Sequence, residues 1–251
     1  MHKKILLLTI LLLFTLPAFS VYADEIFAEG DTFADDDDLY AEYSGPKVAD
    51  TAIADPLYYM NKGMYYFNDK LYFWCLKPVS KGYSYVMPKP ARIGIKNFFY
   101  NLGFPIRFVS NVLQFKFKEA GVETAIFLFN TTYGGLGFTQ LAQDDLGWAN
   151  SNEDLGQTLG SYSVGGGVYI VLPLFGPSSL RDTAGLVGDT FLYPAFYLDN
   201  LATSFIITGA VTVNNTSLRL GDYESLKDAS VDPYAAMKDA YEKIRARKIK
   251  E

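Results

Sequence analysis

Four acidic side chains lie close together in the middle of the sequence: Asp144, Asp145, Glu153 and Asp154. Two carboxyl groups can work as an acid/base pair when a desolvated environment raises the pKa of one of them. Here the neighbouring residues are mainly glycine, asparagine, glutamine and serine, which are typical of loops. We therefore expect these four groups to be solvated and to take no part in catalysis.

The side chains that usually support nucleophilic catalysis are missing from the body of the chain. The only histidine is His2, so the body of the chain can form neither a Ser-His-Asp triad nor a histidine metal site. Ser163 has Ser161 where a nucleophile elbow requires its first glycine. The single cysteine, Cys75, has no disulfide partner, and we expect it to be a small buried apolar residue. We predict no enzyme, no metal and no cofactor.

The N-terminus predicts export. Lys3 and Lys4 precede a ten-residue apolar run, and Ala23 ends a stretch suited to a leader peptidase, so residues 1–23 are predicted to be a secretory signal peptide. Residues 24–50 follow as an acidic disordered linker, with eight of its acidic groups between 24 and 38. The remaining chain carries no long basic face, no zinc-ligand spacing and no motif that reads nucleic-acid bases, which argues against nucleic-acid binding.

The composition of the body favours contact with lipid. Aromatic residues make up 16% of the chain and hydrophobic residues 49%, and tyrosine and tryptophan suit surfaces that are apolar at one end and wet at the other. The longest apolar passage after the signal, residues 190–213, contains Pro194, Asp199 and Asn200. It is therefore a poor transmembrane candidate, although it could lie in a membrane without crossing it.

Residues 95–113 show helical periodicity. The apolar positions step by four and three residues from Ile95 to Leu113, which predicts a helix that is bent or broken at Pro105. A second face is polar but largely uncharged. It can belong either to a soluble surface helix or to a helix between lipid and a watery cavity. Its residues are Lys96, Asn97, Asn101, Asn111 and Gln114.

The C-terminal part, residues 222–251, is predicted to contain an amphipathic basic helix. Asp232 can cap it, Pro233 fits its first turn, and apolar residues from Tyr234 to Ile244 follow one face. Its last turns read KIRARKIK. These cations can simply complement the helix dipole, which is the interpretation we favour, or they can bind anionic headgroups or an acidic partner.

Several stretches together resemble the MlaA/VacJ family. They occur in the family's order and cover nearly all of residues 55–248: DPLYYMNKGMYYFNDKLYFWCLKPVSKGY, YVMPKPARIGIKNFFYNLGFP, NVLQ, FNTTYGGLG, LGQTLGSYSVGGGVYIVLPLFGPSSLRD and VDPYAAMKDAYEKIR. The most specific block ends in LPLFGPSSLRD. Within it and its lead-in, the family motif corresponds to Gly156, Gln157, Thr158, Leu159, Gly160, Pro173, Gly176, Pro177, Arg181 and Asp182.

The resemblance implies a mainly α-helical single domain of short amphipathic helices, with residues 51–221 as its membrane body. These helices would form a ring in the outer membrane around a central amphipathic channel. A phospholipid path needs a polar wall for the headgroup and an apolar side for the tails. Our candidates for that path are Phe67, Asn68, Arg92, Lys96, Asn97, Asn101, Asn111 and Gln114. The run VYIVLPLF would lie within one leaflet or inside the ring, with Arg181 and Asp182 at a polar boundary.

The resemblance also implies a task and partners. Such a protein removes glycerophospholipids misplaced in the outer leaflet and passes them to a periplasmic carrier of the MlaC type, which serves an inner-membrane ABC transporter. Trimeric porins are the expected outer-membrane companions. Two alternatives remain: an adaptor that docks through KIRARKIK without moving lipid, and a lipid hydrolase that uses only carboxylates and serines.

This sequence departs from the family pattern in its anchor. Family members are typically lipoproteins with a cysteine directly after the signal, whereas here Asp24 follows Ala23. We therefore expect a chain that is exported to the periplasmic face of the outer membrane and is not lipidated. Lys62, Ile126 and Gln140 also differ from the usual family residues, which affects porin contact and channel polarity rather than the fold.

Overall fold

The computed structural model describes residues 53–197 and 201–251. Of residues 201 and 202 it describes the backbone alone. The predicted signal peptide and acidic linker lie outside these residues. The described chain is mainly helical and forms one domain, as expected. Its helices are α4 (Tyr58–Leu71), α5 (Lys77–Val86), α6 (Lys89–Leu102), α7 (Phe104–Leu113), α8 (Phe117–Thr132), α9 (Leu141–Asp144), α10 (Leu155–Ser161), α11 (Leu180–Leu192), α12 (Leu201–Leu218), α13 (Asp222–Ala229) and α14 (Pro233–Lys250).

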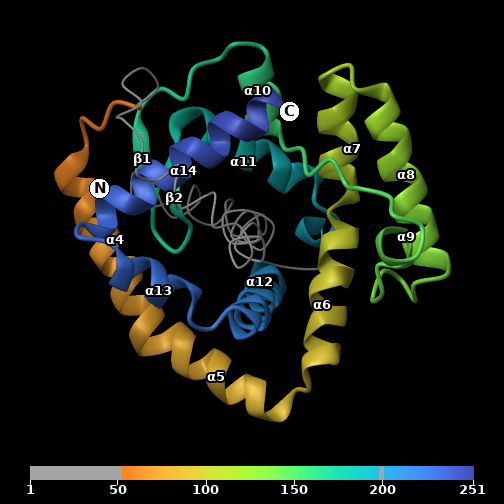
Figure 1. The fold of residues 1–251 in the computed structure, drawn as a ribbon, viewed down its shortest axis with the longest axis horizontal. Coiled ribbons are helices and arrows are strands. Elements are labelled where there is room, and N and C mark those ends of the chain that lie inside the picture. The colour runs from red at the N-terminus through yellow and green to blue at the C-terminus, as the bar shows by residue number, and fades with distance from the viewer. Residues whose placement is uncertain (1–52, 198–200) are drawn as a thin grey trace.

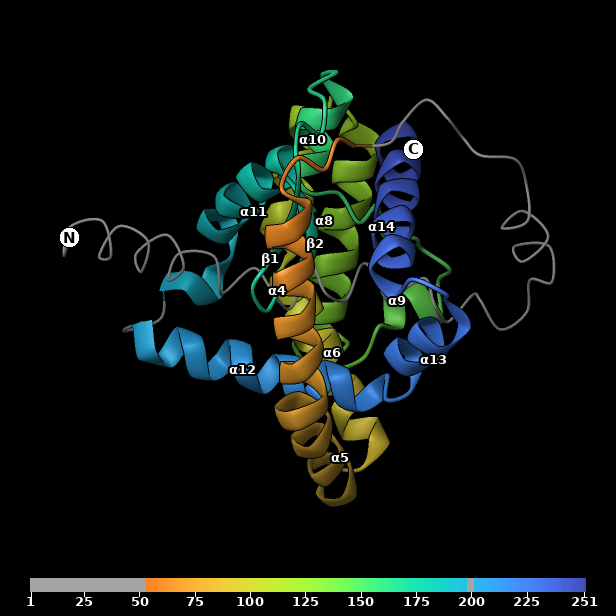
Figure 2. The same cartoon turned by 90° about the vertical axis from the view of Figure 1, so that its left-hand side faces the viewer.

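The helices follow one another around the molecule. Figure 1 shows α4, α5, α6 and α7 along its edge, α14 across the upper side, and α12 seen end-on. A π-helical turn, Tyr72–Leu76, joins α4 to α5, and a 3-10 turn, Pro194–Tyr197, follows α11. In Figure 2 α12 lies lengthwise and extends to one side, and it packs against α5 and α6.

The predicted break in the helix over residues 95–113 is confirmed. Gly103 separates α6 from α7, and Pro105 lies in the first turn of α7, where its missing N–H costs no helical hydrogen bond. The start of α14 is confirmed as well. The Asp232 carboxylate accepts from the backbone nitrogens of Tyr234 and Ala235, and Pro233 opens the helix.

The run VYIVLPLF contains a β-strand that the sequence analysis did not predict. β1 (Tyr169–Leu172) pairs antiparallel with β2 (Gly176–Ser179), with Tyr169 opposite Ser179 and Leu172 opposite Gly176. Gly176, with φ of 74°, helps the chain leave the turn. Asn68 of α4 holds this turn, because its Nδ2 donates to the Leu172 oxygen at 2.9 Å and its Oδ1 accepts from the Leu174 nitrogen at 2.8 Å.

The main apolar cluster joins segments far apart in the sequence. It contains Tyr65 of α4, Tyr169 and Val171 of β1, and Tyr234 and Tyr241 of α14. Their rings meet mostly edge to face, as in the Tyr65–Tyr234 pair with centroids 5.9 Å apart. The C-terminal helix is therefore packed into the body through the apolar face that the sequence predicted.

Candidate functional site

The distribution of side chains is inverted relative to a soluble protein. Among the described residues, 25 polar or charged residues are buried against 13 hydrophobic ones, and 29 large hydrophobic residues are exposed. Tyr59, Tyr85 and Val86 are each at least 80% exposed. Water does not favour so much exposed apolar surface, whereas a lipid environment does. Polar residues are therefore the majority of the buried side chains, beside the apolar clusters, and many large apolar side chains are exposed.

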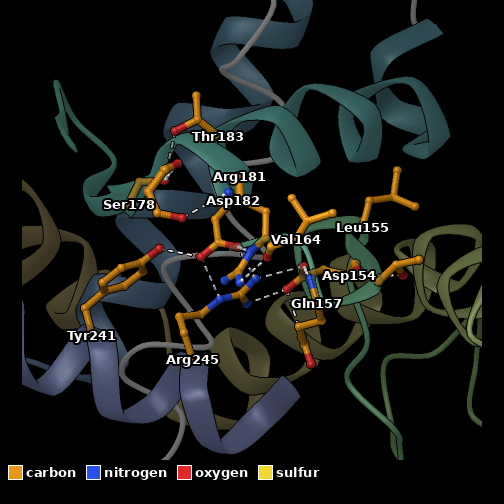
Figure 3. A network of polar contacts seen from close by, with 12 residues as sticks. Asp154, Leu155, Gln157, Val164, Ser178, Arg181, Asp182, Thr183, Tyr241 and Arg245 are labelled. Carbon is orange, nitrogen blue, oxygen red and sulfur yellow. Dashed lines mark hydrogen bonds and ion pairs between the residues drawn. The ribbon is translucent and has the colours of Figure 1, made fainter. Parts of the chain in front are cut away.

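Polar residues from three helices form a buried ionic cluster, shown in Figure 3. Arg245 of α14 donates from Nη1 to Asp154 Oδ2 at 2.6 Å and from Nη2 to Asp182 Oδ1 at 3.0 Å. Arg181 donates from Nε to Asp182 Oδ1 at 2.8 Å, and the Tyr241 hydroxyl donates to Asp182 Oδ2. Two guanidinium groups thus neutralise two carboxylates. We call these five residues the ionic clasp.

The clasp determines the charge state of its carboxylates. Burial raises the pKa of Asp182 and of Asp154, but the charge of Arg245 outweighs it, so both pKa values lie below the ordinary value for aspartate. Both groups are therefore ionised at neutral pH. Asp154 also accepts from the backbone nitrogen of Gln157 at 2.7 Å and so caps α10. The clasp joins α10, α11 and α14.

Two expectations about carboxylates are corrected by this geometry. Asp154 and Glu153 are 2% and 4% exposed, so neither is the solvated loop residue that the surrounding sequence indicated. Glu153 instead accepts from Lys116 Nζ at 2.6 Å. Asp182, expected at a polar boundary, is fully buried. The reason is the same in each case: a cation from a distant segment compensates the lost hydration.

The predicted role of Cys75 is also corrected. Cys75 lies in the π-helical turn between α4 and α5 and is exposed rather than buried. A π-helical turn shifts the helical face, so the apolar neighbours of Cys75 in the sequence do not cover it. Within the described residues no group of histidine, cysteine, aspartate and glutamate is arranged to hold a metal ion.

The polar face of α6 and α7 is largely engaged in holding the fold. Asn101, 6% exposed, donates to Thr131 Oγ1 of α8 at 2.9 Å, and Asn111, fully buried, donates to Ser151 Oγ. Gln114 donates to Glu153 Oε2 at 2.7 Å. These contacts place Asn101 and Asn111 inside the protein and not on an open wall. Asn97 is half-buried, with one longer contact of 3.2 Å to the Phe138 oxygen.

The remaining path candidates lie apart from one another. Arg92 donates to the carbonyl oxygens of Met87 at 3.1 Å and of Ser217 at 2.7 Å, so it holds the C-terminal end of α12 against α6. Lys96, half-buried, lies one turn further along α6. Phe67 is 52% exposed on α4, whereas its neighbour Asn68 is committed to the hairpin turn.

The basic end of α14 is partly an internal structure. Arg245 and Lys248 are 4% and 8% exposed, so they do not form an exposed docking surface. Lys243 is paired with Asp239 at 2.9 Å one turn away, and Arg247 and Lys250 lie in the last turn, where cations are favourable. The favoured interpretation of KIRARKIK as local charge complementation thus holds for the last turn. It missed the buried partners of Arg245.

A family comparison matches almost the whole described chain. The model of the MlaA lipoprotein family covers residues 53–248. The chain belongs to the MlaA lipoprotein family. The intermembrane phospholipid transport system lipoprotein MlaA of Haemophilus influenzae is 31% identical over 190 residues, which is 74% of this chain and 76% of that protein. The protein of the same name from Escherichia coli K12 is 34% identical over 197 residues, 75% of each chain.

Two further comparisons cover more of the chain. An uncharacterised protein of Rickettsia bellii is 26% identical over 229 residues, 90% of this chain and 89% of that protein. A chain solved in work on the structural basis for maintenance of bacterial outer membrane lipid asymmetry has a TM-score of 0.64 and 30% identity. It covers 78% of this chain and 99% of its own length.

The residues predicted as the family motif lie in α10, in the hairpin and at the start of α11, and two of them, Arg181 and Asp182, belong to the ionic clasp. Gly156, Gln157, Thr158, Leu159 and Gly160 form most of α10, Pro173 lies in the hairpin turn, Gly176 and Pro177 are in β2, and Arg181 and Asp182 open α11. A Cβ on Gly156 would lie 2.7 Å from Arg245 Nη2, and one on Gly160 would lie 2.8 Å from Ile249. Glycine at these two positions therefore allows α14 to pack against α10.

The clasp itself was absent from the predicted site. The sequence places Asp182 in the motif and at a polar boundary, and it indicates solvated charges for Arg245 and Asp154. The sequence does contain a signal for the start of α10. An aspartate, Asp154, is followed three residues later by a glutamine, Gln157, which is the pattern of a capping box. Nothing local connects that cap to an arginine 91 residues away.

No helix in the described part of the chain is both long and apolar enough to cross a membrane. The most apolar candidate by sequence, residues 190–213, is divided between the end of α11, the 3-10 turn and α12. Buried serine, threonine and asparagine residues lie among the apolar residues of α12, for example Ser204, Thr208 and Asn214.

Proposed function

We propose that this chain is an outer-membrane phospholipid-transport protein. It takes glycerophospholipids that are misplaced in the outer leaflet and passes them to a soluble periplasmic carrier of the MlaC type, and so maintains lipid asymmetry. Its curated relatives are named as intermembrane phospholipid transport proteins. The single structural observation that carries the proposal is the inverted distribution of side chains, with polar residues as the majority of the buried side chains and many large apolar side chains exposed.

This distribution suits a protein that stays within lipid without a spanning helix. The exposed apolar residues would contact acyl chains, while the helices α4 to α7 and α14 form a ring whose inner side offers a polar route. In this proposal the ring lies mainly in the inner leaflet. Headgroups would pass along polar side chains and tails along apolar ones, so neither part of the lipid loses its preferred surroundings.

The proposed lipid path is narrower than the sequence indicated. Asn101 and Asn111 are buried, and Asn68 and Gln114 are held by structural contacts, so these four would position helices. Phe67 is exposed and Asn97 has one long contact, so both stay candidates for the path, and Arg92 and Lys96 are partly exposed cations on the same helix as Asn97. We propose that Arg92 and Lys96 attract the phosphate and that Asn97 lies beside the headgroup.

Anchoring and partners complete the proposal. The chain would be held in the membrane by its exposed aromatic and aliphatic residues rather than by a lipid on a cysteine. A trimeric porin would hold it in the outer membrane, and an inner-membrane ABC transporter would receive lipid from the carrier. The adaptor alternative depended on an exposed KIRARKIK segment, which the burial of Arg245 and Lys248 disfavours.

Reconstitution tests transport directly. The purified mature chain is inserted into vesicles that contain fluorescent phosphatidylglycerol, and an MlaC-like carrier is added outside. We expect the label to appear on the carrier only when the chain is present, and we expect the recovered lipid to be chemically intact. Label that stays in the vesicles would contradict transport. Released fatty acid would instead support the hydrolase alternative.

A further inference from the structure

A pocket of about 340 Å³ lies where α5, α6 and α12 meet. Tyr83 contributes from α5, Ile95 and Phe99 from α6, and Gly209, Ala210, Val211, Val213 and Asn214 from α12. Its volume falls in the range of about 300–1,000 Å³ that is usual for sites that bind small molecules. The walls are aliphatic or aromatic except at Tyr83 and Asn214, so the occupant must be mostly apolar.

The two polar residues of the pocket are fixed by hydrogen bonds. Tyr83 donates from its hydroxyl to Asn214 Oδ1 at 3.0 Å, and Asn214 donates from Nδ2 to the Arg92 carbonyl oxygen at 2.9 Å. Asn214 is 1% exposed. The polar end of the pocket is therefore preformed, and Asn214 ties it to the backbone of Arg92 on α6.

Arg92 places a positive charge near this end, because Ser217, which it contacts, donates its hydroxyl to the Asn214 carbonyl oxygen at 2.6 Å. Its Nε donates to the Met87 oxygen, and its Nη1 donates to the carbonyl oxygen and hydroxyl of Ser217. Among the described residues no carboxylate is within ion-pair distance of Arg92, and its Nη2 has no hydrogen-bond partner. A guanidinium with free donors and no anion beside it attracts a phosphate group.

We propose that this pocket is a binding site for one acyl chain of a glycerophospholipid, with the phosphate of the same lipid at Arg92. This inference rests on the proposed function and adds a specific resting site to it. The apolar walls bury methylene groups, Tyr83 and Asn214 face the ester region, and Arg92 pairs with the phosphodiester. A neutral lipid with the same chains would occupy the pocket but lose the pairing with Arg92.

Gly209 allows the pocket to be filled without disturbing the fold. A Cβ added at Gly209 would have no atom within 4 Å, and the residue is exposed on α12. The variant Gly209→Leu therefore places an apolar side chain in the space that the acyl chain would use. Gly121 on α8 is the matched control, because its Cβ would also meet nothing within 4 Å and it does not line the pocket.

The test uses the mature chain purified in detergent and phosphatidylglycerol with a photoactivatable acyl chain. We expect cross-links in the wild type and in Gly121→Leu to map to the pocket segments of α6 and α12. Gly209→Leu should reduce them about tenfold, which corresponds to losing the burial of roughly two methylene groups. Equal labelling of these segments in both leucine variants would overturn the proposal.

A second probe tests the phosphate contact. Diacylglycerol with the same photoactivatable chain should label the pocket more weakly than phosphatidylglycerol, and Arg92→Gln should abolish that difference. A preference for phosphatidylglycerol that survives in Arg92→Gln would show that Arg92 does not bind the phosphate. Pocket labelling with no lipid delivery to a carrier would leave the site standing while the transport function fails, so the two proposals are separately testable.

Discussion

Arg245 in the last helix donates to Asp154 Oδ2 at 2.6 Å, although 91 residues separate them in the chain. The same guanidinium contacts Asp182 at 3.0 Å from Nη2 and at 3.0 Å from Nε. Because Asp154 caps α10 and Asp182 lies in the first turn of α11, one side chain fixes the ends of two helices. The C-terminal helix is thus an integral part of the body.

Removing this guanidinium should destabilise the protein strongly. In Arg245→Met two buried carboxylates lose their main cation, and we expect the free energy of unfolding to fall by about 3–5 kcal/mol. Denaturant unfolding in detergent measures the change. Lys243→Ala is the matched control on the same helix, because the Lys243–Asp239 pair is about half exposed and contributes at most about 0.5 kcal/mol. Similar losses in the two variants would contradict the clasp.

The clasp should make stability dependent on pH in the acid range. Arg245 lowers the pKa of both carboxylates despite their burial, so each binds fewer protons in the folded than in the unfolded state. Their stabilisation is complete above the unfolded pKa of about 3.9 and is lost as the pH falls through the lower folded values. Unfolding midpoints at a series of pH values below 5 should therefore decline more steeply for the wild type than for Asp182→Asn. Parallel curves would show that Asp182 does not contribute.

The contact between α10 and α11 requires glycine. A Cβ on Gly185 would lie 2.3 Å from the Gly156 nitrogen and 2.6 Å from its Cα, and this backbone cannot move without separating the helices. Gly185→Ala should cost about 1–3 kcal/mol. Gly121→Ala, in open space on α8, should instead stabilise the helix by up to about 1 kcal/mol. Thermal unfolding of both variants gives the comparison, and a neutral Gly185→Ala would contradict this close packing.

Leucine substitutions at two asparagines of α6 should have different effects, one on stability and the other on lipid transport. Asn101→Leu removes the partner of the Thr131 hydroxyl inside the protein and should lower stability by about 1–3 kcal/mol. Asn97→Leu changes a half-buried residue with one long contact, so it should keep its stability but slow lipid delivery to the carrier. Unchanged delivery by a stable Asn97→Leu protein would remove Asn97 from the path.

The mode of anchoring has its own test. We expect the intact mass of the membrane-extracted protein to equal that of a chain starting at Asp24 without an acyl group. The exposed aromatic residues would then supply the membrane contact. A diacylglyceryl adduct in the mass spectrum would contradict this expectation.

The sequence predicts those elements whose signals are local. Asp232 and Pro233 mark the start of α14, and Gly103 with Pro105 marks the break between α6 and α7, because capping and φ restriction act on a few neighbouring residues. The hairpin was missed because β1 is a four-residue apolar run, for which periodicity cannot separate strand from helix. Its turn is held by Asn68, a contact across 104 residues.

The site was predicted less well because polarity alone does not distinguish a channel wall from a structural contact. Asn101 and Asn111 share a helical face, yet that face turns towards α8 and the segment at Ser151. Arg245 lies among other cations in the sequence, and only the tertiary fold selects it for burial. The sequence of a short basic segment therefore does not show which of its cationic side chains is buried in the protein.

The central claim is that the chain removes phospholipid from the outer leaflet. The most direct measurement is the amount of phospholipid in that leaflet in cells with the chain, without it, and with the mature protein restored. We predict an increase on deletion that restoration reverses, and a failure of the stable Asn97→Leu variant to reverse it fully. No increase on deletion, with the wild-type protein folded and located in the outer membrane, would contradict the account.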